Sequence, residues 1–426
     1  MKLADQLQIA AQLASALRSQ WWDETRILDF QDRALVRMMR HALTNVPFYR
    51  ALGLSPDDIT CTADLKRFPV IAKQDVQKSP EAFLARGFVR DRLYTSRTSG
   101  SSGQPMTSYF DRDAWLLGKY ALKMRRIAAT SRLPVGRRVM IVSEQRPDQL
   151  PALTAAAPSG LRLFSKQHYL SIHTPVAEHL PVLVRYRPHI IYAFPSYLLD
   201  LITVAERERL ALPRIAALYT SSEVLTPAAR RRIERSFGGR VCDVYGSTEF
   251  KEVAWQCHGG RYHLNAESVH IEAPAGGRYG PVVLSSLCNF AMPLLRFSIG
   301  DRAVFGSGAC ACGRQSLTLL AIEGREGDMI DLPDGRRISP YLLTTAIESE
   351  EAILQYRIVQ SGAGAFYVDV VVGARGDSAR WRARVCSDLQ QLLGREVTVA
   401  VREVERLERA PSGKRSVFQR VPAAGG

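Results

Sequence analysis

The sequence has few of the features that mark a secreted or membrane-embedded chain. Its 426 residues include seven cysteines, an odd number spread widely, which argues against a disulfide framework. It contains no uninterrupted apolar run of about 18 residues, the length at which a membrane-spanning helix is suspected. Met1 is followed by a mixed polar stretch rather than by the apolar segment of a leader peptide. The sequence therefore predicts a soluble, cytoplasmic protein with no membrane partner.

Acidic residues are scarce relative to basic ones. The chain has 57 lysines and arginines against 42 aspartates and glutamates, a formal net charge of +15. Such an excess suits an anionic partner, although a scattered, arginine-rich excess also arises from composition alone. The sequence has no zinc-finger, RRM or basic-helix signature, so no nucleic-acid partner is expected.

Apolar periodicity predicts an α/β chain. Apolar residues make up 46% of the sequence, which allows a sizeable core. Residues 1–50 have the period of helices, and residues 265–305 look more purely β. In between, helical patterns alternate with short apolar runs, which is typical of α/β layering. The clearest expected strands are 138–142, 189–193 and 216–219.

The pattern changes after residue 326. Strands are expected over residues 366–372 and 397–401, with a helix over 376–393 between them. The sequence therefore predicts a large N-terminal multi-sheet α/β domain, residues 1–326, followed by a small C-terminal α+β domain, residues 327–426.

A loop rich in glycine and serine is the first segment with chemical meaning. It reads Thr-Ser-Arg-Thr-Ser-Gly-Ser-Ser-Gly-Gln-Pro over residues 95–105. Small residues let backbone N–H groups and hydroxyls approach phosphate oxygens closely, although the same composition suits a flexible linker. The loop is not a Walker A motif, because Gly-Lys-Ser/Thr does not follow, and it lacks the Gly-x-Ser-x-Gly of a hydrolase.

Two further segments place a carboxylate after an apolar strand. Residues 241–249 end in Tyr-Gly-Ser-Thr-Glu, where Glu249 suits Mg²⁺ and Tyr245 could stack on a flat ring. Residues 295–301 end in Gly-Asp, and Asp301 suits the hydroxyls of a ribose. Taken alone, each is also an ordinary strand-to-loop turn.

The last two segments lie at the domain boundary and near the C-terminus. Gly-Arg-Glu-Gly-Asp occupies residues 324–328, and Ala-Pro-Ser-Gly-Lys occupies residues 410–414. A lysine on such a loop can swing in as a mobile charge against a carboxylate and an α-phosphate. The alternative for Lys414 is a solvated surface residue.

In this order, the five segments resemble those of the adenylate-forming superfamily of acyl-CoA synthetases, adenylation domains and luciferases. The short chain and the wording of residues 45–50, 194–198 and 310–314 are similar to the phenylacetate–CoA ligase branch. The resemblance covers nearly the whole chain. It implies that the chain uses ATP and Mg²⁺ to activate a carboxylic acid as its acyl-adenylate, and that the small C-terminal domain is mobile.

The resemblance also implies a role for each matching residue. Lys414 would be catalytic, orienting the carboxylate and stabilising charge on the α-phosphate. Glu249 would hold Mg²⁺, and Gly327 with Asp328 would form the hinge. Acid-binding residues would be Phe194, Ser196, Tyr197, Tyr245 and Gly246. ATP-binding residues would be Thr98, Ser99, Gly100, Ser101, Ser102 and Gly103 on the phosphates, Asp301 and Arg325 on the ribose, and Ser222, Glu223, Asp243, Tyr245, Gly246, Ser247 and Thr248 around the rest of the nucleotide.

Three positions depart from the family pattern. Gln104 stands where the loop normally has lysine, and Arg97 is inserted among its small residues. Phosphate binding is then weaker or differently supported. Gly327 stands where the hinge normally has aspartate or lysine, which makes that hinge more permissive.

Cysteines and histidines form a candidate zinc site. Cys310 and Cys312 lie in a glycine-flanked turn, and Cys257 and His263 lie upstream. These four are the expected ligands, with His258 as the alternative to His263; some relatives with this Cys-x-Cys-Gly-Arg wording resemble zinc binders. Four such ligands leave no open position, so the zinc would be structural. The alternative is thiols without metal.

The acyl acceptor is not readable from the sequence. The resemblance favours coenzyme A, while an amine acceptor, or release of the acyl-adenylate as product, stays open. An aromatic acid is expected from the branch and from Phe194, Tyr197 and Tyr245, although aromatic residues are also ordinary core. A nucleotide-binding module without chemistry is disfavoured, because Lys414 and Glu249 would be superfluous for binding alone. The resemblance also implies a homodimer.

Overall fold

The computed structural model describes residues 2–97, 105–131, 136–156, 165–274, 277–306, 308–350, 352–362, 364–373, 378–394, 396–410 and 413–421. The chain divides into two compact units, the first made of residues 1–137, 157–166 and 242–322 and the second of residues 138–156, 167–241 and 323–426. The predicted phosphate loop, residues 98–103, and Gln104 lie outside the described residues. Within the described part, no helix is long and apolar enough to cross a membrane.

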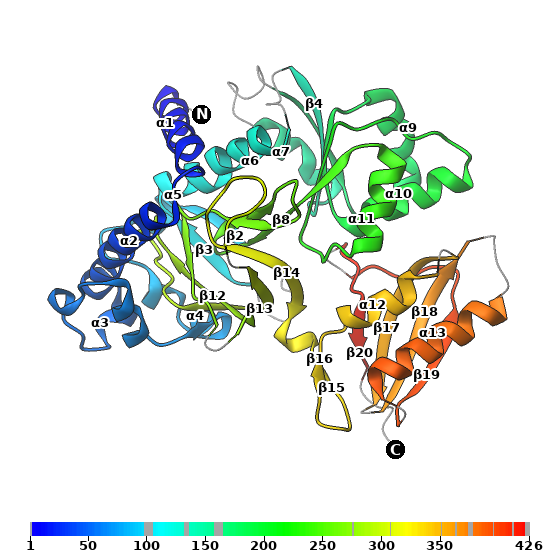
Figure 1. Cartoon of the computed structure of the whole chain (residues 1–426). Coiled ribbons are helices and arrows are strands. Elements are labelled where there is room, and N and C mark those ends of the chain that lie inside the picture. The colour runs from blue at the N-terminus through cyan, green and yellow to red at the C-terminus, as the bar shows by residue number, and fades with distance from the viewer. Residues whose placement is uncertain are drawn as a thin grey trace. The chain divides into compact units, whose positions relative to one another are not determined.

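The first unit begins with helices, as the sequence predicts (Figure 1). Asp23 starts the longest of them, because its side chain accepts a hydrogen bond from the Arg26 N–H at 2.8 Å. Pro47 follows the end of that helix and opens a short new one. The helices are α1 (Leu3–Ser19), α2 (Glu24–Asn45), α3 (Pro47–Arg50), α4 (Lys73–Lys78), α5 (Arg112–Leu116) and α6 (Leu122–Thr130), with a π-helical turn at Leu117–Ala121 between the last two.

Strands of the first unit form mainly antiparallel pairs. Their order is β11-β12-β13-β14-β10-β9-β8, with β1 paired to β13 and a separate β2–β3 hairpin. The predicted β character of residues 265–305 is confirmed by β11, β12 and β13. The bounds are β1 (Ile71–Ala72), β2 (Tyr94–Arg97), β3 (Thr107–Phe110), β8 (Arg240–Ser247), β9 (Lys251–Gln256), β10 (Tyr262–Leu264), β11 (Val269–Ile271), β12 (Tyr279–Ser286), β13 (Phe297–Gly306) and β14 (Thr318–Arg325).

The second unit contains the predicted α/β layering. Strands β4, β6 and β7 pair in parallel, and β5 lies beside β4. Helix α11 begins at Pro227 behind the Thr226 cap and ends where Gly238 takes a left-handed conformation. The bounds are β4 (Arg137–Ser143), α7 (Leu150–Ala156), β5 (Ser165–Ser171), α9 (Val176–Tyr186), β6 (Ile190–Ala193), α10 (Pro195–Arg207), β7 (Ala217–Ser221) and α11 (Pro227–Phe237).

The C-terminal residues of the second unit have a core of their own. Phe366, Val368 and Val370 alternate along β18 and pack with Trp381 and Val385 of α13. The strand order is β19-β18-β17-β20, and the predicted strands and helix of this region are confirmed (Figure 1). The domain boundary after residue 326 stays a prediction. The bounds are β15 (Ile330–Asp331), β16 (Arg337–Ile338), α12 (Tyr341–Glu348), β17 (Ile353–Gly362), β18 (Ala365–Val372), α13 (Ser378–Leu393), β19 (Thr398–Glu403) and β20 (Phe418–Arg420).

Together, the layered parallel strands, the antiparallel strands and the separate α+β region confirm the predicted α/β fold class.

Candidate functional site

In the first unit, two predicted nucleotide-binding side chains contact each other. The Tyr245 hydroxyl donates a hydrogen bond to Asp301 Oδ2 at 2.8 Å. This bond fixes the Tyr245 ring against the Asp301 carboxylate. Asp243, in contrast, is buried and accepts a 2.7 Å hydrogen bond from the Tyr262 hydroxyl. Asp243 therefore supports the strand, and its contact with nucleotide stays a prediction.

The turn after Tyr245 requires glycine. A Cβ on Gly246 would lie 2.3 Å from the carbonyl oxygen of Lys251, so no other residue fits there without moving the backbone. The Ser247 hydroxyl accepts a hydrogen bond from the Phe250 N–H at 3.2 Å and closes the turn that carries Thr248 and Glu249. Strands β8 and β9 shift register at this point, which is a common way to re-aim side chains beside a site.

In the second unit, Glu223 holds two segments together. Its carboxylate accepts hydrogen bonds of 2.9 Å from the Ser196 N–H, the Ser196 hydroxyl and the Arg415 N–H. Burial raises the pKa of Glu223, and the hydrogen bonds oppose that rise. The neighbouring Ser222 has a φ of 70°, a strained conformation for a residue other than glycine. Ser196, Glu223 and the segment that carries Lys414 are therefore one connected group.

Lys414 itself is held by a carboxylate. Its Nζ lies 2.9 Å from Glu144 Oε1 and 5.9 Å from the centre of the Phe194 ring. The preceding Gly413 has a φ of 79°, and a Cβ there would lie 2.4 Å from Ile172 Cγ2. Glycine is thus what allows the chain to pass this close to Ile172.

Asp200 on helix α10 anchors the same segment. Its carboxylate pairs with the guanidinium of Arg415 at 2.9 Å and with that of Arg409, and it accepts a 2.6 Å hydrogen bond from Gln355 Nε2. Asp200 is 8% exposed. Because both arginines flank Lys414 in sequence, this network fixes the position of the lysine.

The aromatic residues predicted for acid binding are mostly core. Phe194 and Tyr197 are 5% and 1% exposed and belong to the apolar core of the second unit. The Tyr197 hydroxyl is hydrogen-bonded to His179 Nδ1 at 2.8 Å, and burial raises the pKa of Tyr197. Both residues shape the unit from inside, and their contact with an acid stays a prediction.

The predicted hinge forms a short 3₁₀ turn. Glu326–Asp328 follows β14, whose last residue is Arg325. A Cβ on Gly327 would meet no atom within 4 Å, so glycine there is not required by packing. Burial raises the pKa of Asp328, opposed by the charges of Arg325 and Arg420. Its role as a hinge stays a prediction.

In the first unit, the structure brings together the four predicted zinc ligands. One donor atom from each of Cys257, His263, Cys310 and Cys312 lies within 4.8 Å of the other three. The two sulfurs of Cys257 and Cys310 are 3.5 Å apart, and Cys312 Sγ is 3.2 Å from His263 Nε2. Such separations fit a tetrahedral ion with metal–ligand distances of about 2.0–2.3 Å.

The surroundings of the four donors also suit a metal. Ser316 Oγ lies 3.2 Å from His263 Nδ1 and fixes the ring, and the Gly259 N–H donates to Cys257 Sγ at 3.3 Å. Burial lowers the pKa of His263 to about 4, which favours the neutral imidazole that a metal binds. Of the two histidines that the sequence left open, the structure groups His263 with the cysteines and leaves His258 outside.

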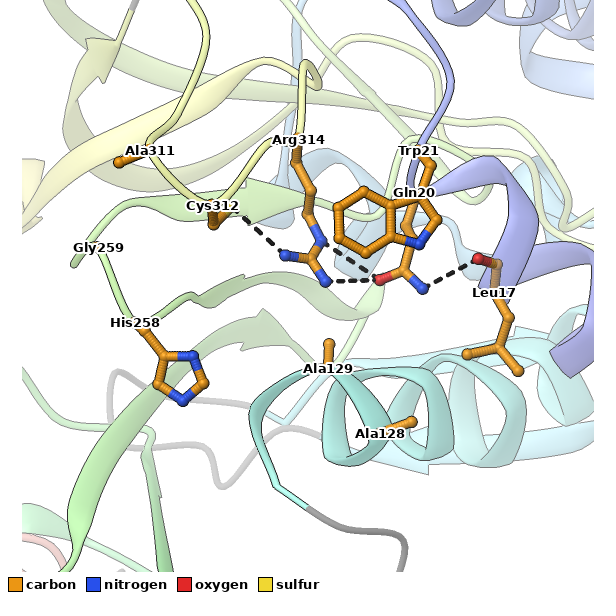
Figure 2. A pocket seen from close by; sticks show the side chains of 10 residues that line it. All are labelled: Leu17, Gln20, Trp21, Ala128, Ala129, His258, Gly259, Ala311, Cys312 and Arg314. Atoms are coloured by element: carbon orange, nitrogen blue, oxygen red, sulfur yellow. Dashed lines mark hydrogen bonds between the residues drawn. The ribbon is translucent and has the colours of Figure 1, made fainter.

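His258 instead lines a neighbouring cavity of about 710 Å³. Figure 2 shows Arg314 beside Trp21 in this cavity, with hydrogen bonds to Gln20 and to Cys312 Sγ. The guanidinium lies 4.4 Å from the centre of the Trp21 ring. Helix α1 and the residues after it therefore cover one side of the cysteine cluster.

Sequence reasoning missed Asp200, Glu144 and Lys251. Asp200 lies in an otherwise apolar stretch, which is a signal for a buried acid. Glu144 directly follows a strand, and its position at a strand end was the signal available for it. Lys251 follows the Tyr245 turn by a few residues, and its φ of 63° is visible only in the structure.

Comparisons with known proteins agree with this arrangement. No family model matches the chain. The chain is similar to the phenylacetate–coenzyme A ligase of Thermus thermophilus, at 23% identity over 401 residues that cover 86% of this chain and 83% of the relative. It is also similar to the phenylacetate–coenzyme A ligase of Escherichia coli, at 26% identity over 72% of each chain.

The solved structures share the fold. A 2-hydroxyisobutyryl-CoA ligase in complex with R3-HIB-AMP has a TM-score of 0.79 and 21% identity, covering 95% of this chain and 91% of its own. An amide bond synthetase, McbA of Marinactinospora thermotolerans, has a TM-score of 0.51 and 18% identity, covering 76% of this chain and 68% of its own. The similarity to these relatives supports the predicted resemblance to the phenylacetate–CoA ligase branch, and the solved structures show the same fold.

Proposed function

We propose that the chain uses ATP to convert a carboxylic acid into its acyl-adenylate and pyrophosphate, and then transfers the acyl group to coenzyme A. The observation that carries this proposal is the Lys414 segment. Lys414 pairs with Glu144, and the adjacent Arg415 is bound by Asp200 and Glu223. An ordinary surface lysine does not need three acids to position its segment. The relatives named phenylacetate–coenzyme A ligase support the same chemistry.

In the first unit, the assigned roles follow from donor chemistry. Asp301, oriented by Tyr245, accepts hydrogen bonds from the ribose hydroxyls. Gly246, which the close Lys251 carbonyl requires, is assigned to the nucleotide and to the acid by the family resemblance. A single carboxylate such as Glu249, completed by phosphate oxygens and water, suits Mg²⁺, which neutralises phosphate charge when bound. The phosphates themselves are assigned to residues 98–103.

In the second unit, Lys414 supplies a positive charge to the acid carboxylate and the α-phosphate during adenylation. Its ion pair with Glu144 keeps the ammonium group in place before substrates bind. Arg325 is assigned to the ribose, and residues 327–328 to a hinge about which residues 327–426 move between the two half-reactions.

We also propose that Cys257, His263, Cys310 and Cys312 hold a structural Zn²⁺. All four positions of a tetrahedral ion would be taken by protein, so the metal would stabilise loops and would not take part in the reaction. The homodimer implied by the family resemblance is likewise a proposal.

The acid is proposed to be aromatic, from the branch and from Phe194, Tyr197 and Tyr245. A second candidate function keeps the adenylation step and passes the acyl group to an amine. The fold similarity to an amide bond synthetase supports keeping this alternative.

ATP–pyrophosphate exchange tests the first step. The protein is incubated with ATP, Mg²⁺, labelled pyrophosphate and one carboxylic acid at a time, without coenzyme A. We expect exchange with aromatic acids, and its loss in Lys414→Ala with little change in melting temperature. Lys66→Ala, at an exposed lysine, is the matched control.

The outcomes separate the alternatives. Exchange only with short aliphatic acids would overturn the aromatic assignment, and no exchange with any acid would count against the proposed function. Adding coenzyme A or amines to an active mixture then identifies the acceptor. Equal loss of exchange and melting temperature in Lys414→Ala would make Lys414 a structural residue.

A further inference from the structure

A group of lysines on an aromatic surface lies beside the Tyr245 turn and has no part in the function proposed so far. Lys251 Nζ lies 4.3 Å from the centre of the Phe110 ring and 4.6 Å from that of Trp115. Lys119 Nζ lies 4.9 Å from the Trp115 ring, and Lys123 follows one helical turn later. We call Phe110, Trp115, Lys119, Lys123 and Lys251 the lysine–aromatic cluster.

The backbone around the cluster is unusual at several points. Lys251 has a φ of 63°, a conformation that costs free energy in a residue other than glycine and tends to persist at functional sites. The facing helix contains the π-helical turn Leu117–Ala121, a feature that is also frequent at such sites. Within it, a Cβ on Gly118 would lie 3.2 Å from Lys251 Cβ and Cγ. The helix therefore leaves room for the Lys251 side chain.

A further ring stiffens the aromatic surface. Tyr94 stacks on Trp115, with ring centres 5.1 Å apart and an angle of 11° between the planes. Trp115 also contacts Phe110, with ring centres 5.8 Å apart. Lys119 and Lys251 thus contact aromatic rings that are held in place by one another.

Burial and mutual repulsion disfavour the charged forms of these lysines. Burial, and to a lesser extent repulsion from Lys119 and Lys123, lower the pKa of Lys251 to about 7, while the attraction of Glu249 opposes the shift. Burial also lowers the pKa of Lys123 to about 8 and lowers that of Lys119.

Glu249 attracts Lys251 and Glu252 attracts Lys123, but among the described residues neither acid forms an ion pair with Lys251 or Lys119. Glu252, the acid nearest in sequence to Lys251, is buried and pairs with Arg126 at 3.1 Å. Lys119 is nevertheless exposed, and Lys123 and Lys251 are partly exposed. The lysines therefore pack against protein and still reach water, where their ammonium groups attract anions.

The cluster adjoins the turn assigned to the acid. Lys251 is the cross-strand partner of Ser247, one residue after Gly246, in the β8–β9 ladder. In the β2–β3 hairpin, Phe110 pairs with Tyr94 at one end, and Arg97 pairs with Thr107 at the other end. The predicted phosphate loop connects the two strands at the Arg97–Thr107 end. Three residue steps along a strand separate those ends by about 10 Å. The cluster therefore adjoins the turn assigned to the acid and lies away from the loop assigned to the phosphates. We expect an oxyanion bound at the cluster to belong to the acid.

We propose that the lysine–aromatic cluster binds a second oxyanion of the acid substrate, so that the enzyme activates aromatic acids that carry another carboxylate, or a comparable anionic group, remote from the activated carboxyl. The proposal rests on the adenylation function proposed above and narrows its substrate class. Lys251 and Lys119 hold the oxyanion, and the Trp115 and Phe110 rings contact the apolar body of the acid.

Binding is tested first, without catalysis. The protein is pulse-labelled at pH 7 with an amine-reactive acetylating reagent, and labelling of each lysine is read by mass spectrometry. We expect 4-carboxyphenylacetate to protect Lys251, while phenylacetate and pyrophosphate do not, and exposed Lys66 to be labelled equally in every arm. Protection by pyrophosphate alone would assign the cluster to phosphates, and protection by neither acid would leave it without this ligand; either result overturns the proposal.

Catalytic specificity is tested next, with the same two acids in ATP–pyrophosphate exchange. We expect Lys251→Met to lower kcat/KM for 4-carboxyphenylacetate about 30-fold more than for phenylacetate, the size expected for one lost charge-assisted hydrogen bond. Lys251→Arg should retain part of the preference, and Lys66→Met should match the wild type. Equal losses for both acids would overturn the proposal. Protection of Lys251 without exchange from any acid would instead overturn the adenylation function and leave the anion site standing.

Discussion

Asp200 offers the sharpest test of how the Lys414 segment works. Its carboxylate pairs with Arg415 at 2.9 Å and with Arg409, and the side chains of Asp200 and Arg415 are 11% and 9% exposed. Asp200→Asn keeps the size of the side chain and removes the charge that both arginines face. We expect the variant to lose adenylation because Lys414 no longer stays in place, although Asp200 does not touch a reacting atom.

The structure sets the size of the effect. Removing one partner of a buried ion pair costs about 3–5 kcal/mol when the other charge stays buried. Here the two guanidinium groups regain water when the segment leaves helix α10, so the lower end, about 3 kcal/mol, applies. At about 1.4 kcal/mol per factor of ten, the population with Lys414 in place falls by about 100-fold.

The assay compares two half-reactions in the same variant. ATP–pyrophosphate exchange should fall about 100-fold, whereas thioester formation from a supplied acyl-adenylate and coenzyme A should change by less than about threefold. Asp334→Asn is the matched control, since its pair with Arg336 is 44% and 49% exposed and such pairs contribute about 0–1 kcal/mol. Exchange in Asp200→Asn that stays close to that of the control would refute the reasoning.

Three further predictions concern stability and metal content. Elemental analysis of the purified protein should find one zinc per chain, and Cys310→Ser should lose the metal together with several degrees of melting temperature, while Cys61→Ser, at an exposed cysteine, should do neither. Arg126→Met leaves the buried Glu252 carboxylate without its partner and should cost about 3–5 kcal/mol in urea unfolding, whereas the double variant with Glu252→Gln should recover part of that loss. Lys251→Met should stabilise the protein most near pH 6.5 and progressively less up to pH 10, measured as melting temperatures. The sign follows from the pKa of Lys251, which is about 7 in the folded chain against an ordinary 10.5. Between these pH values the unfolded wild type binds more protons than the folded wild type, so the free energy of unfolding of the wild type rises with pH. The advantage of the variant therefore shrinks over this range. A constant advantage across that range would contradict the lowered pKa.

Local patterns explain what could be predicted from the sequence. The strands 138–142, 189–193 and 216–219 follow from apolar runs a few residues long, and the structure contains strands at all three places. The four metal-ligand candidates were also predictable, because thiols and imidazole at loop positions have few other uses together. Both kinds of signal are carried by residues that are close in sequence or chemically distinctive.

Long-range contacts explain what could not be predicted. Asp200 meets Arg415 across 215 positions of sequence and Gln355 across 155. In the sequence, the apolar neighbours of Asp200 indicate a buried acid, but nothing local identifies the two arginines that it receives. Tyr197 makes a similar contact that the sequence does not reveal, since its hydroxyl is hydrogen-bonded to His179 in the core, and its contact with the acid stays a prediction.

The same contacts explain why the Lys414 segment suits a reversible role. It is held by the Asp200 and Glu144 carboxylates and by the hydrogen bond from the Arg415 N–H to Glu223, rather than by a large apolar surface. A hydrogen bond of this kind exchanges for one with water at a net cost of only about 0.5–3 kcal/mol, whereas a buried apolar side chain resists removal in proportion to its area. A polar anchor therefore gives Lys414 a defined position and still lets it leave, which the proposed movement of residues 327–426 between the two half-reactions requires.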